Sequence, residues 1–252
     1  MISLRSCRKN ISDYIAKPFF FQRAVLFLNV MKKVLAFNGS ARKYGNTWNL
    51  LESFARGVEK GEGSYEIIEA HNTNLEYCTG CLRCNLIKRC SLRGDEWNDI
   101  SAKILESDVL VFATPIYFHH VSGQLKKIID RFRSFVHVQI TETGLKHTPH
   151  VEWNKNFVLL LSLGSSNDSD AQPVIELLQY MVNMLGPQNR LHVVTATRLG
   201  VIKQVSKTKK ELLELYPKIG LPETLIDEDF EKNQKTLQQC FELGEKLVTG
   251  SF

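Results

Sequence analysis

The chain has 252 residues, of which 43% are hydrophobic and 23% charged, an ordinary composition for a soluble globular protein. The low glycine and proline content excludes a low-complexity chain, and no apolar run approaches the roughly 18 residues that would cross a bilayer. The formal net charge is +5, but most of it lies in residues 1–30, so the remaining chain offers no basic face for nucleic acid.

Residues 1–30 differ in composition from the rest. Basic residues precede an apolar stretch that begins at Phe19, a weak sign of a targeting segment, but Gln22 and Arg23 interrupt it and no small-residue cleavage site follows. We interpret residues 1–30 as an N-terminal extension upstream of the true start, with a transit peptide as the alternative. One domain is expected over residues 31–252.

Short apolar runs alternate with amphipathic stripes from Lys33 onward. The runs predict strands over Val34–Phe37, Tyr65–Glu69, Val109–Ala113, Phe157–Leu163 and Leu191–Thr195. Continuous apolar strands joined by helices are typical of a parallel sheet covered on both faces. We therefore predict an α/β fold of the flavodoxin-like, doubly wound type, with five parallel strands in the order 2-1-3-4-5 and helices on both faces. Two long connections remain, 133–156 and 200–229, and the second is predicted to contain a helix over Lys207–Leu215.

The first candidate site follows the first strand and runs from Asn38 to Thr47. Its glycines permit a tight turn, and Asn46 or Thr47 is expected to cap a helix that begins at Trp48. Free amides at such a helix start attract a phosphate. The loop lacks both the P-loop ending and the Gly-x-Gly-x-x-Gly pattern, so an ordinary capped turn is the alternative to an anion site.

Two further loops follow central strands, where open α/β sheets bind ligands. Thr114–Gly123 places aromatic residues beside a proline, a combination that suits a planar ring. His119 and His120 are adjacent, so one shared metal ion is not expected. The third loop, Ser162–Ser166, contains Gly164 at the same edge of the sheet.

Four cysteines are crowded into the pattern Cys78-x2-Cys81-x2-Cys84-x5-Cys90. This density suits a cubane iron–sulfur cluster, whereas structural zinc more often uses two separated knuckles. Nearby basic residues would stabilise thiolates or an anionic cluster: Arg83, Lys88 and Arg89. A reduced cysteine loop without metal is the alternative. In either case we expect a reducing, cytoplasmic setting.

These motifs resemble those of the NAD(P)H-dependent FMN reductases of flavodoxin-like fold. The resemblance covers about residues 32 to 196, and the cysteine block is similar to that of the iron–sulfur flavoproteins within this family. It implies bound FMN, with the phosphate on Ser40, Arg42, Asn46 and Thr47. The isoalloxazine would lie along Pro115, Ile116, Tyr117 and Phe118, near Gly164.

The resemblance also implies a function. We expect an FMN-dependent NAD(P)H oxidoreductase that passes electrons from a nicotinamide nucleotide to a quinone, flavin or other small acceptor. The alternative is an electron-transfer protein whose cysteines hold a 4Fe-4S cluster and exchange electrons with a ferredoxin-like partner. Members of this family are commonly homodimers or homotetramers, and the 133–156 connection is apolar enough to act as a lid or as an arm across such an interface.

Overall fold

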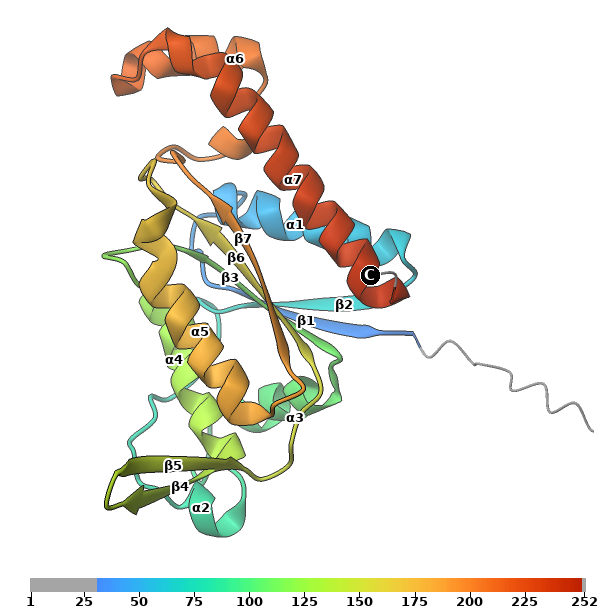
Figure 1. Ribbon diagram of the computed structural model, residues 1–252, viewed down its shortest axis with the longest axis vertical. Helices are drawn as coiled ribbons and strands as arrows, with labels where there is room; N and C mark the ends of the chain where they lie inside the picture. Colours follow the sequence, from blue (N-terminus) through green and yellow to red (C-terminus); the bar gives the residue numbers. More distant parts are fainter. Residues whose placement is uncertain (1–30, 251–252) are drawn as a thin grey trace, which may run out of the picture. The chain divides into compact units, whose positions relative to one another are not determined.

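The computed structural model describes residues 31–250, so the interpretation of residues 1–30 lies outside the described part of the chain. Its main sheet consists of five strands (Figure 1). These are β1 (Lys33–Asn38), β2 (Ser64–Glu69), β3 (Val109–Pro115), β6 (Asn156–Ser162) and β7 (Arg190–Ala196). All neighbours are parallel, in the order β2-β1-β3-β6-β7. The predicted fold and strand order are confirmed.

Side chains along the strands alternate between two hydrophobic cores. In β1, for example, Leu35 and Phe37 face one core, whereas Val34 and Ala36 face the other. The helices divide in the same way, so both faces of the sheet are covered (Figure 1). One side carries α3 (Trp97–Glu106), α4 (Gly123–Arg131) and α5 (Gln172–Leu185), and the other carries α1 (Asn46–Lys60) and α7 (Ile226–Thr249). Among residues 31–250, no helix is both long and apolar enough to span a membrane.

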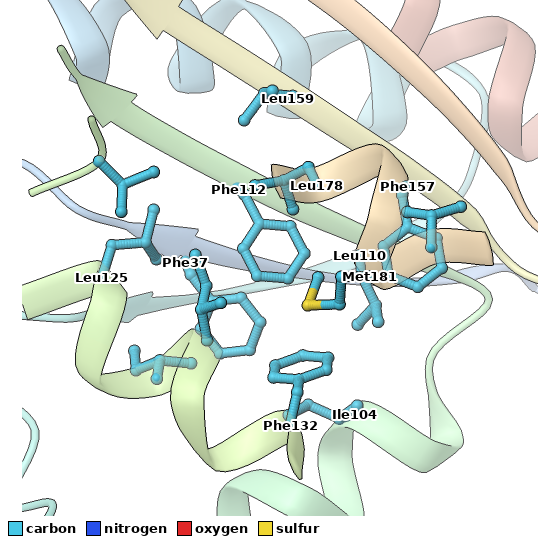
Figure 2. Packing of buried hydrophobic residues seen from close by; sticks show 14 of the residues in the cluster. Phe37, Ile104, Leu110, Phe112, Leu125, Phe132, Phe157, Leu159, Leu178 and Met181 are labelled. Carbon is cyan, nitrogen blue, oxygen red and sulfur yellow. The ribbon is translucent and has the colours of Figure 1, made fainter. Parts of the chain in front are cut away.

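Aromatic rings fill the first core. Phe132 packs edge-on against Phe37 and is tilted against Phe112, with ring centroids 6.5 and 5.7 Å apart (Figure 2). Met181 of α5 closes the same cluster, and all four side chains are buried. Burial of rings this large contributes about 1.5–3 kcal/mol each, so this core fixes the helices against the sheet.

The 133–156 connection forms an antiparallel hairpin of β4 (Val136–Thr141) and β5 (Gly144–Pro149). Asn85 in the short helix α2 (Cys84–Ile87) ties the cysteine loop to this hairpin. Its Nδ2 donates to the Val138 carbonyl at 2.8 Å, and its Oδ1 accepts from the Val138 amide at 3.0 Å. The hairpin therefore fixes the position of the cysteine loop.

The last connection contains α6 (Lys209–Leu215), close to the predicted helix. Thr208 begins it with a reciprocal capping box to Glu211. Short 3₁₀ turns complete the described chain: Phe132–Phe135, Asp168–Ala171, Gln204–Ser206, Tyr216–Ile219 and Glu223–Leu225.

Candidate functional site

A cleft of about 210 Å³ opens at the carboxyl ends of β1, β3, β6 and β7. It is lined by Ser40, Arg42, Asn46, Thr47, Pro115, Ile116, Tyr117, Ser162, Gly164, Leu199 and Gly200. Every residue predicted for the flavin site is present except Phe118. The three loops identified from the sequence therefore meet at one place, the edge where open α/β sheets hold their ligands.

The candidate phosphate loop, Asn38 to Thr47, is anchored to its neighbouring strand at Gly39. The Gly39 amide donates to the Ala113 carbonyl at 2.7 Å. A Cβ on Gly39 would lie 3.0 Å from that carbonyl oxygen and equally close to the side chains of Ser122 and Leu125. Glycine is needed here because the backbone packs directly against β3 and α4.

The start of α1 differs from the prediction. The helix begins at Asn46, two residues before Trp48, and its N-cap residue Gly45 offers no side chain, so the predicted cap from Asn46 or Thr47 is wrong. The first amides of α1 therefore have neither an intrahelical partner nor a side-chain cap. Donors of this kind, together with the helix dipole, favour an anion in the cleft.

Asn46 and Thr47 make long-range contacts instead of capping. Asn46 Nδ2 donates to the carbonyls of Leu199 and Val201, and its Oδ1 accepts from the Val205 amide. These bonds use both amide hydrogens and hold residues 199–205 against the helix start, which leaves only the backbone of Asn46 for a phosphate. Thr47 Oγ1 lies 2.8 Å from Ser162 Oγ, so it joins the phosphate loop to the end of β6.

Leu199 and Gly200 are cleft residues that the sequence analysis missed. They follow β7, whose carboxyl end reaches the same sheet edge, and this position was the available signal. The contacts from Asn46 that fix these residues join positions far apart in the sequence, which no local pattern reports.

The aromatic loop after β3 closes in a two-residue turn. Tyr117 and His120 exchange two backbone hydrogen bonds, of 2.9 and 3.0 Å, around Phe118 and His119. Both central residues have positive φ, 49° and 59°, which is strained for non-glycine residues. Tyr117 lines the cleft, whereas the Phe118 side chain is fully exposed beside it.

All four clustered cysteines line one narrow hollow of about 20 Å³. Cys84 is buried and Cys90 half-buried, whereas Cys78 and Cys81 are exposed. Within residues 31–250, no three His, Cys, Asp or Glu side chains are grouped so that they could hold a single metal ion. The hollow therefore gathers the thiols without forming a mononuclear metal site.

Two guanidinium groups contact the thiols, that of the buried Arg131 and that of the half-buried Arg133. Arg131 Nη2 lies 3.4 Å from Cys90 Sγ, and Arg133 Nη1 lies 3.6 Å from Cys84 Sγ. Burial raises the pKa of the Cys84 thiol, although the charge of Arg133 opposes that effect. These two cations come from the end of α4 and the turn that follows it. Of the predicted Arg83, Lys88 and Arg89, Arg83 acts on the exposed Cys81: its backbone hydrogen bond lowers the pKa of that thiol, and its charge adds a smaller effect in the same direction.

Arg131 is nearly inaccessible, at 1% exposure, and forms an ion pair with the buried Asp95. Its Nε has no hydrogen-bond partner within the described residues. An unsatisfied buried donor is costly, and Arg131 lines the hollow, so an acceptor that reached this atom would be stabilised.

The sequence comparison decides the family. The family model described as NADPH-dependent FMN reductase matches residues 32–198. The chain belongs to this family. The match begins just before β1 and includes all five strands of the sheet and every residue of the predicted flavin and cysteine sites.

The chain is similar in sequence to curated relatives and similar in fold to solved structures. Two iron–sulfur flavoproteins from Archaeoglobus fulgidus are 31% and 41% identical over 105 and 101 residues, or 42% and 40% of this chain. The chain spans about half the length of these relatives, 47% and 49%. An FMN-dependent NADH-azoreductase from Bacillus anthracis, solved with FMN, superposes with a TM-score of 0.52 at 15% identity. That alignment covers 86% of this chain and 100% of the azoreductase, and it shows the shared fold.

Proposed function

We propose that the chain is an FMN-dependent NAD(P)H oxidoreductase that passes electrons to a quinone, flavin or other small acceptor. The observation that carries this proposal is the uncapped N-terminus of α1 at the cleft, with a hydroxyl and a free cation beside it. Arg42 makes no ion pair with any residue between 31 and 250, so its charge is available to a phosphate.

The residues of the cleft suit FMN. Ser40, Arg42 and Thr47 would hold its phosphate with the α1 amides, while Pro115, Ile116 and Tyr117 would lie along the ring. Apart from Gly164 and its two chain neighbours, no described residue has an atom within 4 Å of the place where a Cβ on Gly164 would stand, so this wall leaves room for a ligand. When bound, FMN would supply hydride acceptance from a nicotinamide nucleotide and electron delivery to an acceptor.

Turnover tests this proposal. The chain reconstituted with FMN should oxidise NADH or NADPH when a quinone is added. The double variant Arg42→Ala with Thr47→Ala should retain much less FMN while keeping the fold, because neither side chain belongs to a hydrophobic core. A chain that remains colourless after reconstitution would contradict the proposal.

A second candidate function rests on the cysteine hollow. We propose a 4Fe-4S cluster there, which would make the chain an electron-transfer protein working with a ferredoxin-like partner. Four thiols around one hollow, with two guanidinium contacts and the unpartnered Arg131 Nε, support an anionic cluster. Each cysteine of such a cluster binds a different iron, so the thiols need not converge on one ion.

Iron analysis after anaerobic purification separates the two functions. Cys84→Ser should abolish iron binding and one-electron transfer while FMN is retained, whereas Cys240→Ala, at a buried thiol outside the hollow, should keep both. If the wild-type chain holds no iron and Cys84→Ser loses FMN, the cysteine loop belongs to the flavin site and the cluster proposal is wrong.

We also propose that the protein is cytoplasmic and that it assembles as a homodimer or homotetramer. The exposed Phe118 at the cleft and the exposed hairpin residues Ile140 and Leu145 support a partner surface. Light scattering on the FMN-loaded protein tests it, and a clean monomer that keeps its flavin would overturn a shared site.

A further inference from the structure

A second cavity, of about 370 Å³, lies on the β2 side of the phosphate loop. It is lined by Asn38, Ser40, Arg42, Lys43, Tyr44, Trp48, Glu69, His71 and Asn72. Two of these, Ser40 and Arg42, also line the flavin cleft. The two spaces therefore flank the same loop, and apart from Ser40 and Arg42 the lining of the second has no part in the proposed flavin contacts.

An aromatic ring with positive charge on its faces forms one wall of this cavity. The ammonium groups of Lys43 and Lys203 lie 5.1 and 5.2 Å from the centroid of the Tyr44 ring. Trp48 packs edge-on against the same ring, with centroids 6.1 Å apart. Tyr44 is 47% exposed, and the two lysine side chains above it are flexible, so a flat partner can displace an ammonium group and stack on the ring. Such a ring suits a purine base with a phosphate nearby.

A carboxylate stands at the other side of the cavity. Glu69 is the last residue of β2, and its Oε2 accepts from Asn38 Nδ2 at 2.8 Å and lies 3.6 Å from His71 Nδ1. Its other oxygen, Oε1, has no partner among residues 31–250. In dinucleotide-binding α/β folds, an acidic residue beyond the phosphate loop accepts a hydrogen bond from the adenosine ribose.

Cations complete the set of groups. Arg42 and Lys43 line the cavity, and neither makes an ion pair with a described residue. A stacking ring, a ribose acceptor and unpaired cations thus stand around one space beside the flavin phosphate. Together they match the three parts of an adenosine phosphate.

We propose that this cavity binds the adenylate half of a dinucleotide. The adenine stacks on Tyr44, a ribose hydroxyl donates to Glu69, and the phosphate lies near Arg42 and Lys43. The inference rests on the proposed function, because the flavin phosphate fixes one end of the arrangement. The adenylate has two possible sources: the nicotinamide nucleotide, or FAD bound in place of FMN.

Calorimetry on the FMN-loaded protein tests the cavity with 5′-AMP as the probe. Tyr44→Ala should weaken AMP binding about ten-fold through loss of stacking, and Tyr44→Phe should restore it. The matched control is Tyr65→Ala, an exposed tyrosine on β2 outside the cavity, which should leave AMP binding unchanged. FMN affinity should be the same in all of these proteins.

The carboxylate is tested separately. Glu69→Gln keeps an acceptor for Asn38 but removes the charge that repels a 2′-phosphate. Binding of 2′,5′-ADP should therefore improve relative to 5′-AMP in this variant. An unchanged ratio would exclude Glu69 from the ribose contact and overturn that part of the proposal.

The two sources of the adenylate give different results. If it belongs to FAD, Tyr44→Ala weakens binding of FAD but not of FMN to the flavin-free protein. If it belongs to the nicotinamide nucleotide, the same variant raises KM for NAD(P)H with kcat preserved. The inference alone is overturned if the protein binds FMN but neither 5′-AMP nor 2′,5′-ADP, and if Tyr44→Ala changes neither FAD binding nor the KM for NAD(P)H. If the protein binds no FMN, the proposed function is overturned as well.

Discussion

Thr47 connects two loops of the flavin cleft through a buried hydroxyl pair with Ser162. Thr47→Ala leaves the Ser162 hydroxyl without this partner, so we expect a loss of about 1 kcal/mol in stability and weaker FMN binding. Thr47→Ser keeps the hydroxyl and should preserve both. Thermal unfolding measures the loss of stability, and flavin fluorescence measures FMN binding. Equal FMN affinity in Thr47→Ala and wild type would show that the Thr47 hydroxyl does not contact the phosphate.

Asp229 carries a buried negative charge that makes stability depend on pH. Burial alone would raise the pKa of its carboxyl, but hydrogen bonds from Lys232, Tyr216 and Arg198 outweigh burial and lower the pKa. A lowered pKa in the folded state contributes stability above the unfolded value of about 3.9, and this stability is lost as the pH falls through the folded pKa.

Removing the charge of Asp229 should therefore make the stability of the protein less dependent on pH in the acid range. Asp229→Asn is expected to be less stable than wild type at neutral pH, with the difference shrinking toward the acid. The melting temperature measured across that range provides the test, with the neighbouring Glu228, which lies 3.9 Å from Arg198, changed to Gln as the control. Parallel curves for Asp229→Asn and wild type would contradict the assignment.

At the scale of elements, the Phe118–His119 turn has the geometry that normally selects Asn-Gly. Replacing His119 with Gly should stabilise the chain by about 1 kcal/mol, because glycine adopts positive φ without strain. Adding Phe118→Asn should stabilise it further but weaken FMN binding if the exposed ring contacts the flavin. Urea unfolding measures the stability of both variants, and flavin titration measures their FMN affinity. If His119→Gly is no more stable than wild type, the positive φ of His119 does not strain the turn.

Helices α1 and α7 pack so closely that glycine is required where they cross. A Cβ on Gly244 would collide with the Phe54 carbonyl oxygen of α1. Gly244→Ala should therefore cost about 1–3 kcal/mol by overpacking. Gly123→Ala is the control, since open space surrounds that position at the start of α4. A melting temperature unchanged by Gly244→Ala would show that the helices can separate freely.

The strands could be predicted from the sequence where a run of apolar residues is also buried in the fold. Buried parallel strands read as unbroken apolar runs, as β3 and β6 do, and all five predicted ranges fall on observed strands to within about one or two residues. The start of α1 was not predictable, because Gly45 begins the helix without a side-chain cap. The role of Asn46 depends on carbonyls of residues 199 and 201, whose positions only the folded chain defines.

At the scale of the whole molecule, the family match ends at residue 198, but residues beyond it also line the cleft and pack in the core. Leu199 and Gly200 line the cleft proposed for the flavin, and α7 covers the same sheet face as α1, whose first residues we propose as the phosphate site. The tail that follows the family match therefore contributes both to the core and to the lining of the proposed flavin cleft. The same loop also supplies Lys203 to the Tyr44 ring of the second cavity.

We propose that the cleft binds FMN and that NAD(P)H reduces the flavin there. Anaerobic titration of the FMN-reconstituted chain with NADH and NADPH, followed by flavin absorbance, tests this claim most directly. We expect stoichiometric FMN whose absorbance is bleached by at least one of the two nucleotides and restored by a quinone. A chain that retains no FMN, or whose bound FMN neither nucleotide bleaches, would contradict it.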